Sequence, residues 1–382
     1  MNPRTLIAAV IAGAASLVAT AAPQAPLQAE QPRAEKLGAP TSHWLFVTDT
    51  NFLGYLDGKV YLFDGDSGAM LGMLSVGAYA NAIEIAPDAS ALYVPEIYYS
   101  RGTRGDRTEV VTTYDTTELK PIAEVVIPPK RATGLPHRAY QGMTDDGRFV
   151  LVDNMTPATS VSVVDVQAQK FVTEIEISGC NLVYPTGNRS FVSLCGDGTL
   201  QRVQLDDAGN VAARSHTAKF FDPDKDPITE KASRAGDTWY FVSFSGQVYP
   251  VAIKSDSVVP GKPWSLFNAA ERKDNWKVGG AQFNAAHATL GRLYVAVHQG
   301  PPYGHKDPGT QVWVYDVAKR VGIARIQLQN PASNIAVTKD AKPLLVTDDA
   351  ATPAVDVYDA LTGELLRTIA GPPATPSFIQ SP

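Results

Sequence analysis

The chain has 382 residues, of which 44% are hydrophobic and 19% are charged, and its formal net charge is −6 at pH 7. This composition is typical of a globular protein with a large core and excludes a chain that is disordered throughout. The acidic balance argues against a nucleic-acid-binding surface, which needs a basic stripe to displace the counterions of phosphate.

Residues 1–21 have the pattern of a secretory signal peptide. Arg4 precedes an apolar run from Leu6 to Val18, and small residues at 19–21 precede the expected cleavage. A membrane anchor is the alternative, but the run of about 13 residues is shorter than the ~20 that a bilayer requires. We therefore predict export to the periplasm, a cleaved signal peptide and no membrane span. Residues 22–40, rich in Pro, Gln and Ala, are predicted to be a flexible leader.

The same turn sequence occurs near both ends of the remaining chain. Asp64 ends an apolar strand and is followed by Ser at +3 and Gly at +4, and Asp359 is followed by Thr and Gly at the same offsets. The Asp and Ser/Thr side chains can bond the turn backbone, and the Gly accepts a positive φ. Both segments are therefore predicted to be hairpin turns of one repeated antiparallel unit.

Weaker copies of this unit fill the middle of the chain. Strands that end at Asp115, Asp165 and Asp316 each precede a polar turn. The intervals are 51 residues from 64 to 115, 50 from 115 to 165 and 43 from 316 to 359, a period that indicates propeller blades or solenoid units. A second turn, at residues 86–88, 144–146 and 338–340, precedes another short apolar strand, so that each unit has about four strands.

These repeats predict an all-β fold, a seven-bladed β-propeller of four-stranded antiparallel blades over residues 41–382. Seven blades give about 49 residues each, whereas six would need about 57 and eight about 43. We expect strands from the two ends to close the ring, with residues 43–48 completing a blade with residues 354–358.

A basic loop, residues 101–107, separates two predicted strands and contains Arg101 and Arg104. A solvated turn, with Asp106 paired to an arginine, explains it without any function, and such a surface pair contributes little. The alternative is a docking surface, where planar guanidinium groups bind carboxylates of a partner.

The two cysteines, Cys180 and Cys195, lie on a predicted strand–turn–strand segment. In an oxidising compartment they are predicted to form a structural disulfide across one hairpin. Closing a loop of this size contributes about 3 kcal/mol. A redox-active dithiol is the alternative, but the close C-x-x-C spacing that lowers a thiol pKa is absent.

The sequence has no motif for an exposed nucleophile, a helical zinc site, a phosphate loop or a haem attachment. None of its six histidines has helical metal-ligand spacing, although side chains from separate blades can meet in a propeller channel. His305 and Lys306 lie in a Gly/Pro-rich stretch, residues 300–309, of the kind that binds partners. We predict no catalytic residue and no metal site in this chain.

Several segments resemble the heavy subunit of the quinoprotein amine dehydrogenases, with the aromatic amine dehydrogenase branch closer than the methylamine branch. They run from about residue 44 to about residue 370 and cover nearly the whole mature chain. The matching segments are 127–131 (IPPKR), 144–149 (TDDGRF), 154–160 (NMTPATS), 163–166 (VVDV), 263–266 (PWSL) and 365–369 (LLRTI). Further matches are Arg101 and Arg104, residues 179–180 and 195–198, residues 275–276 and 279–280, and His305 with Lys306.

The resemblance implies a periplasmic seven-bladed propeller in an assembly of two heavy and two light subunits. In that family the light subunit carries tryptophan tryptophylquinone and the catalytic base, and the heavy subunit holds no cofactor. Amines are oxidised to aldehyde and ammonia, and the electrons pass singly to a type I copper protein such as azurin or amicyanin. This chain would then be a scaffold for the light subunit, with Arg101, Arg104, His305 and Lys306 as interface residues.

Tyr79 matches, with a one-residue shift, the position where the family places a Phe beside the substrate channel. An ordinary aromatic in a blade turn is the alternative. If Tyr79 lines the channel, the size of its ring selects the amine, because a methylene-scale change in an apolar pocket shifts selectivity by about 1 to 3 kcal/mol.

A different class of function stays open. The chain would then be a self-sufficient periplasmic propeller, acting as a ligand-binding protein or as a lactonase-like hydrolase with a metal in its channel. Stoichiometric metal and activity in the isolated chain would favour this reading. The sequence also leaves the preference for aromatic or aliphatic amines open.

Overall fold

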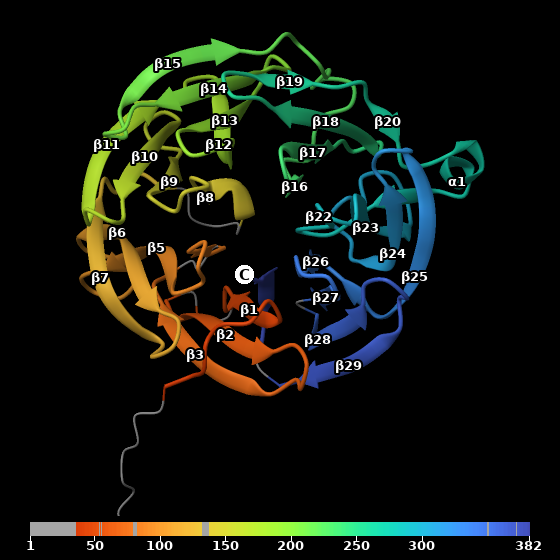
Figure 1. The fold of residues 1–382 in the computed structure, drawn as a ribbon, viewed down its shortest axis with the longest axis horizontal. Coiled ribbons are helices and arrows are strands. Elements are labelled where there is room, and N and C mark those ends of the chain that lie inside the picture. The colour runs from red at the N-terminus through yellow and green to blue at the C-terminus, as the bar shows by residue number, and fades with distance from the viewer. Residues whose placement is uncertain are drawn as a thin grey trace, which may run out of the picture. The chain divides into compact units, whose positions relative to one another are not determined.

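Seven antiparallel sheets surround a central axis in the computed structural model of the chain (Figure 1). The structure describes residues 36–52, 54, 56–78, 82–131, 137–349, 351–371 and 373–382, which belong to one unit, Lys36–Pro382. The predicted signal peptide and Tyr79 lie outside the described residues. The prediction of an all-β, seven-bladed propeller is confirmed.

Each blade runs from an innermost strand at the axis to an outermost strand at the rim. The second blade comprises β4 (Glu84–Ile85), β5 (Ala91–Tyr99), β6 (Arg107–Asp115) and β7 (Lys120–Ile127). The third comprises β8 (Gln141–Met143), β9 (Phe149–Asn154), β10 (Ser160–Asp165) and β11 (Lys170–Glu176), preceded by the 3₁₀ turn η1 (Arg138–Tyr140). The fourth comprises β12 (Cys180–Pro185), β13 (Ser190–Cys195), β14 (Leu200–Leu205) and β15 (Val211–His216).

The fifth and sixth blades each carry one additional strand. The fifth comprises β16 (Ser233–Ala235), β17 (Thr238–Val242), β18 (Gln247–Ile253) and β19 (Val258–Pro260), with β20 (Trp264–Ser265) also paired to β18. The sixth comprises β22 (Asn284–His287), β23 (Arg292–Gln299), β24 (Gly309–Asp316) and β25 (Val321–Ala332), with β21 (Trp276–Val278) also paired to β23. Between them lies the helix α1 (Ala269–Lys273), at the outer rim in Figure 1 and begun by a capping box of Asn268 and Glu271.

The seventh blade comprises β26 (Asn334–Val337), β27 (Leu344–Asp349), β28 (Thr352–Asp359) and β29 (Leu365–Ala370). The first blade closes the ring by combining both ends of the described chain. Its strands are β30 (Pro376–Gln380), β1 (Trp44–Asp49), β2 (Gly58–Asp64) and β3 (Met70–Val76), in order from the axis outward.

The prediction of closure between the chain ends is confirmed, but the predicted partner strand is wrong. β1 pairs with β30, with Val47 opposite Ile379, whereas residues 354–358 belong to β28 inside the seventh blade. Where the Asp turn occurs, it follows the third strand of a blade, so it gives no signal for β30, which has no such turn after it. The repeat therefore predicts the number of blades correctly but does not identify the strand that closes the ring.

Strand direction gives the ring two distinct faces. Because neighbouring strands of a blade are antiparallel, the links between its second and third strands emerge on the same face as the links to the next blade. We call this the loop face. The links between first and second strands and between third and fourth strands emerge on the opposite face, which we call the turn face.

The predicted Asp turns lie on the turn face and have the predicted chemistry. Asp64 Oδ1 accepts hydrogen bonds from the backbone N–H groups of Asp66, at 2.7 Å, and Ser67, at 3.3 Å. Asp359 makes the equivalent bonds at 2.7 and 2.9 Å. The glycines that end the two turns, Gly68 and Gly363, have φ of 78° and 80°, where a residue with a Cβ would be strained.

The middle strands of the blades form the core. All six residues of β1, β9 and β10 are buried, because each blade packs between two neighbours and both sheet faces are covered. The outermost strand β29 is mostly exposed, with only Ile369 buried. The fold therefore leaves its rim, its two faces and its central channel to interact with other molecules.

Candidate functional site

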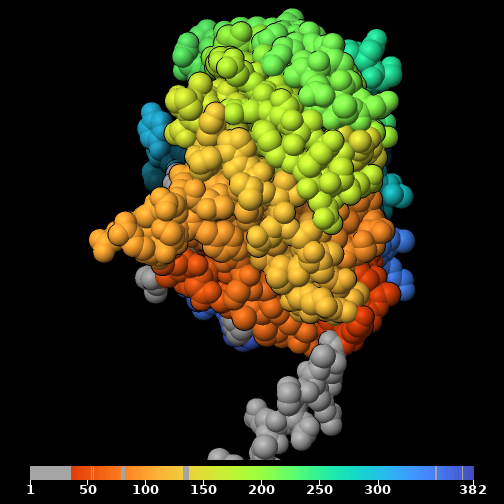
Figure 2. Space-filling view, turned by 90° about the vertical axis from the view of Figure 1, so that its left-hand side faces the viewer, coloured from red at the N-terminus to blue at the C-terminus, as the bar shows by residue number. Residues whose placement is uncertain are grey.

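The hairpin of β5 and β6 carries Arg101 and Arg104 at its tip. Both strands have nine residues, and the tip is closed by a hydrogen bond from Arg101 N to Arg104 O at 3.0 Å. Both side chains are exposed, and neither takes part in the ion pairs found among the described residues. Figure 2 shows this orange hairpin projecting beyond the rest of the ring. The two guanidinium groups are therefore available to a partner.

His305 and Lys306 lie in the loop between β23 and β24, also on the loop face. The ring of His305 packs on Phe244, with 4.2 Å between the ring centroids. Burial, followed by the charges of Lys231 and Lys306, lowers the pKa of His305. His305 is thus a half-buried, neutral packing residue, whereas Lys306 is exposed.

The predicted interface residues share a face but do not form one patch. The arginine hairpin belongs to the second blade and the His305 loop to the sixth, so that the seventh and first blades separate them on one side of the ring. Close to the hairpin base, Ala78 forms a β-bridge with Ile97, and Gly77 N donates to Glu96 Oε1 at 2.9 Å. Ala78, the last described residue of this segment, therefore lies beside the arginine hairpin, two residues from the end of β5.

Four exposed apolar side chains on the loop face were not predicted. They are Leu56, Tyr98, Met155 and Tyr303, with exposed fractions of 43%, 42%, 40% and 90%. Leu56 lies near the arginine hairpin, since its Cδ1 is 3.7 Å from where a Cβ on Gly102 would lie. Each occurs singly in a loop or at a strand end, so no sequence period identifies it. Exposed apolar side chains beside unpaired arginines are typical of protein interfaces.

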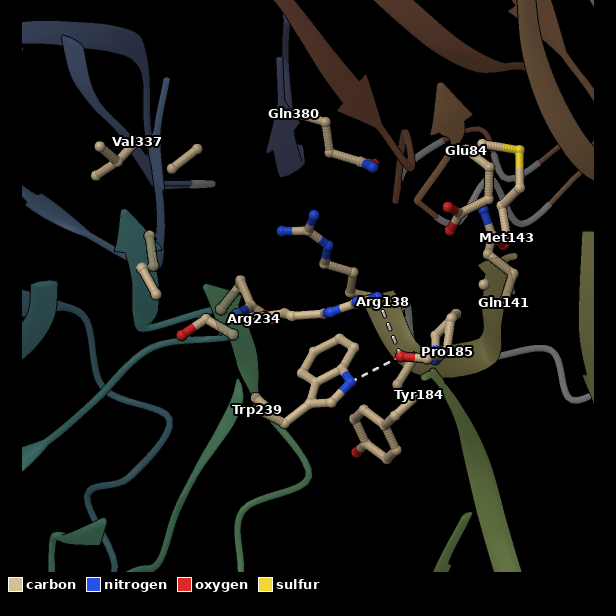
Figure 3. Close-up of a pocket in the computed structure, with 18 of the residues that line it drawn as sticks. Glu84, Arg138, Gln141, Met143, Tyr184, Pro185, Arg234, Trp239, Val337 and Gln380 are labelled. Atoms are coloured by element: carbon tan, nitrogen blue, oxygen red, sulfur yellow. Dashed lines mark hydrogen bonds between the residues drawn. The ribbon is translucent and has the colours of Figure 1, made fainter. Parts of the chain in front are cut away.

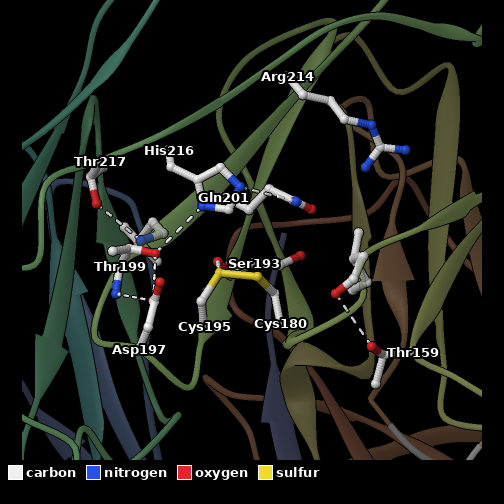
Figure 4. Close-up of a disulfide and its surroundings, with 12 residues drawn as sticks. Thr159, Cys180, Ser193, Cys195, Asp197, Thr199, Gln201, Arg214, His216 and Thr217 are labelled. Carbon is white, nitrogen blue, oxygen red and sulfur yellow. Dashed lines mark hydrogen bonds between the residues drawn. A yellow bond between two sulfur atoms is a disulfide. The ribbon is translucent and has the colours of Figure 1, made fainter.

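Cys180 and Cys195 form a disulfide, with an S–S distance of 2.01 Å and a Cα–Cα distance of 3.9 Å (Figure 4). They are direct register partners on β12 and β13, and both are 4% exposed. The disulfide lies at the loop-face end of this hairpin, where Gly196 N also donates to Gly179 O at 3.1 Å. The predicted structural disulfide is confirmed.

The central channel contains a cavity of about 390 Å³ (Figure 3). Much of its lining comes from the ends of innermost strands that face the turns, including Met143, Pro185, Val337 and Gln380. Lys339, in the turn that follows β26, also contributes. The cavity is therefore displaced toward the turn face, away from the predicted interface residues.

Three ionisable side chains in this cavity form no direct ion pair with another described residue. Glu84 and Arg138 point into the cavity in Figure 3, and Lys339 also lines it. Burial raises the pKa of Glu84 to about 7, although the charges of Arg138 and Lys339 oppose the rise. Burial lowers the pKa of Arg138, and burial together with the Arg138 charge lowers that of Lys339. Arg138 and Lys339 are nevertheless exposed to solvent, whereas Glu84 is half-buried.

No pattern in the sequence predicts this cavity. Its ionisable residues come from separate blades, and neither their spacing nor their residue types match a known motif. No group of three or more His, Cys, Asp or Glu side chains in the described part of the chain is arranged to hold a metal ion.

Comparison with known proteins decides the family. The family model for the methylamine dehydrogenase heavy chain matches residues 42–381. This chain belongs to that family.

The similar curated proteins are themselves methylamine dehydrogenase heavy chains. The protein from Methylophilus methylotrophus is 29% identical over 345 residues, 89% of this heavy chain and 84% of the relative. The protein from Methylobacillus flagellatus is 30% identical over 307 residues, 80% of this chain and 76% of the relative. The protein from Paracoccus versutus is 27% identical over 345 residues, 90% and 80% of the two chains. The amine dehydrogenase heavy subunit predicted from the resemblance is confirmed, and the closer likeness to the aromatic branch stays a prediction.

Solved structures at lower identity share the fold. A dihydro-heme d1 dehydrogenase, NirN, has a TM-score of 0.54 at 18% identity, over 92% of this heavy chain and 77% of that chain. A protein of unknown function from Desulfotomaculum acetoxidans has a TM-score of 0.59 at 14% identity, over 89% and 98%. In the part of the heavy chain that the structure describes, no helix combines the length and apolar character needed to cross a bilayer.

Proposed function

We propose that this heavy chain is the non-catalytic subunit of a periplasmic quinoprotein amine dehydrogenase, which oxidises primary amines to aldehyde and ammonia. The family match over residues 42–381 carries the proposal, since it spans all seven blades. A heavy chain implies a light partner, and the assembly has two of each. Tryptophan tryptophylquinone, held by the light subunit, supplies the redox chemistry, and a type I copper protein such as azurin or amicyanin accepts the electrons.

The loop face is the surface on which the light subunit docks. It carries the projecting arginine hairpin, Lys306 and the exposed apolar residues Leu56, Tyr98 and Tyr303. Apolar contacts supply most of the affinity of a protein interface, and exposed charges at its rim set orientation and association rate. Arg101 and Arg104 would bind carboxylates of the light subunit in the fork geometry of guanidinium.

Tyr79 lines the path of the amine to the light subunit. Its support is the sequence match and the position of its neighbour Ala78, which is bridged to Ile97 on the arginine hairpin. Ala78 and Ile97 lie toward the loop face, on which the light subunit is proposed to dock. The tyrosine ring then limits the size of the amine by contact, without a chemical role.

Two observations support export to the periplasm. The first is the signal-peptide pattern of residues 1–21. The second is the Cys180–Cys195 disulfide, a bond that persists in oxidising compartments. N-terminal sequencing of the mature protein tests both, because a chain that still begins at Met1 would contradict cleavage.

Purification of the native assembly tests the proposal. We expect a small, cysteine-rich chain with modified tryptophans to co-purify with the heavy chain in equal amounts, and peptide mass spectrometry identifies it. A heavy chain that purifies alone, with stoichiometric metal and hydrolase activity, would instead support the self-sufficient propeller.

A further inference from the structure

The cavity in the central channel has a charge arrangement that the proposed docking of a light subunit does not use. Two other charged groups in its lining already have partners. Arg234 makes two hydrogen bonds to Asp145, at 2.6 and 2.8 Å. Glu230 lies 3.2 Å from Lys231 Nζ. Among the residues that the structure describes, Arg138 and Lys339 have no such partner within 4 Å.

Local structure holds these two cations in place from different blades. Arg138 begins η1, where His137 Nδ1 accepts a hydrogen bond from Ala139 N at 3.1 Å. Lys339 lies in a turn fixed by Thr338, whose hydroxyl donates to Asp340 at 2.7 Å and accepts from Leu344 N at 2.8 Å. Arg138 is close enough for its charge to lower the pKa of Lys339. Two like charges therefore line one cavity.

An anion between these cations would relieve their repulsion. Glu84 supplies a carboxyl group to the same space, but its raised pKa leaves a large fraction of it neutral near pH 7. It therefore compensates at most part of the two positive charges. Charge alone favours an anionic ligand.

The rest of the lining is mixed, with polar side chains such as Gln141, Ser233 and Gln282 beside an apolar part that can contact the body of a ligand. The apolar part includes Met143, Ala286, Ala336, Val337 and Trp239. The Trp239 indole N–H already donates to Pro185 O at 2.8 Å (Figure 3), so that its ring offers the cavity an apolar surface. A cavity of about 390 Å³ lies within the size range of small-molecule sites.

The geometry points to a binding site for a small organic carboxylate, with its carboxylate between Arg138 and Lys339 and its apolar body against Trp239 and the alanines. A planar guanidinium matches a carboxylate in two parallel hydrogen bonds. Phosphate shares the anionic chemistry but has no apolar body to contact Trp239 and the alanines, so the apolar part of the lining favours the organic carboxylate. The site is independent of the amine chemistry and lies toward the opposite face from the proposed docking surface.

Calorimetric titration of the native assembly tests this site. Sodium benzoate and sodium 3-phenylpropionate are the organic probes, and sodium phosphate and neutral benzyl alcohol test the charge and the apolar body separately. We expect the carboxylates to bind with Kd of about 1 mM or below, and phosphate and benzyl alcohol to bind at least about tenfold more weakly. Phosphate binding as tight as benzoate binding would overturn the carboxylate assignment.

Variants locate the site. Arg138→Gln and Lys339→Gln should each raise the Kd for benzoate by about tenfold or more, while Lys254→Gln, an exposed cation on a turn-face loop, should leave it within about twofold. Circular dichroism and thermal unfolding confirm that each variant is folded. The site would be ruled out if the native assembly binds neither carboxylate at about 20 mM, or if the folded Lys339→Gln variant binds benzoate as the native protein does.

Discussion

Gln380 on the closing strand β30 bonds both backbone groups of Ile83, which lies 297 residues away in the chain. Ile83 N donates to Gln380 Oε1 at 2.9 Å, and Gln380 Nε2 donates to Ile83 O at 2.6 Å. Ile83 precedes the innermost strand of the second blade, so one amide side chain joins the closing blade to its neighbour. Both residues are buried. Water therefore cannot easily replace these two hydrogen bonds, which help to close the ring.

Gln380→Leu tests this link between blades. The change keeps the size of the side chain but leaves a buried N–H and a buried C=O without partners, so we expect a loss of about 2 to 4 kcal/mol in the free energy of unfolding. Urea unfolding measures it. Gln167→Leu, in an exposed turn, is the control and should change stability by less than about 0.5 kcal/mol. An equally small change at Gln380 would show that the link contributes nothing.

Local turn chemistry explains why the blades were predictable. The side chains of Asp64 and Asp359 bond backbone groups two and three residues ahead, so that the whole turn is encoded in five consecutive residues. Cys180 and Cys195 were predictable for a similar reason, since one hairpin makes them register partners.

The closing strand and the channel cavity depend on contacts between distant parts of the chain. β30 lacks an Asp turn, and its assignment rests on pairing with β1 more than 300 residues away. Glu84, Arg138 and Lys339 meet only because the ring brings their blades to one axis. A single sequence carries no spacing signal for such a group. The exposed apolar residues of the loop face were missed for the same reason.

Removal of the disulfide should lower stability without changing the fold. Cys180→Ala with Cys195→Ala reopens a loop with a sequence separation of 15 residues, and the expected loss is about 3 kcal/mol, equivalent to several degrees in Tm. Thermal unfolding with and without reductant measures it. Reductant should lower the Tm of the native chain and leave that of the double variant unchanged. A lower Tm of the double variant in reductant would show that reductant acts on stability by a route other than reduction of this disulfide.

Glu84 should make stability depend on pH. Its pKa rises from 4.5 to about 7 on folding, so its ionisation has no cost below about pH 4.5 and destabilises the folded state increasingly up to about pH 7. Above that range Glu84→Gln should be more stable than the native chain by about 1 to 3 kcal/mol. The groups that face Glu84, Arg138 and Lys339, reduce this effect but do not reverse it.

Urea unfolding at pH 5 and pH 8 measures the Glu84 effect. The gain from Glu84→Gln should be large at pH 8 and small at pH 5. Glu364→Gln removes an exposed carboxylate and should show no such difference between the two pH values. A gain that is equal at both pH values would mean that ionisation of Glu84 is not its cause.

Charge reversal at the arginine hairpin should weaken binding of the light subunit. We expect Arg101→Glu with Arg104→Glu to slow association about tenfold and to reduce its dependence on salt, because both groups are exposed and have no ion-pair partner among the described residues. Surface plasmon resonance with immobilised light subunit measures it. Lys170→Glu, exposed on β11, is the matched control. Equal association rates for the two variants would show that the hairpin is not part of the interface.

Substitution of Tyr79 should change which amines are oxidised. Tyr79→Ala would widen the proposed path and shift the ratio of kcat/KM between a bulky and a small primary amine by about 10-fold to 100-fold toward the bulky one. Tyr79→Phe keeps the ring and should change this ratio by less than about threefold. Steady-state kinetics of the reconstituted assembly with 2-phenylethylamine and methylamine measure both. An unchanged ratio in Tyr79→Ala would show that Tyr79 does not line the path of the amine.

Amine oxidation by separated and recombined subunits tests the central claim, that this propeller is a scaffold without its own catalytic centre. The purified heavy chain should reduce no electron acceptor when a primary amine is added, and activity should appear in proportion to the light subunit mixed with it, up to equal amounts. Turnover of an amine by the heavy chain alone would contradict the account.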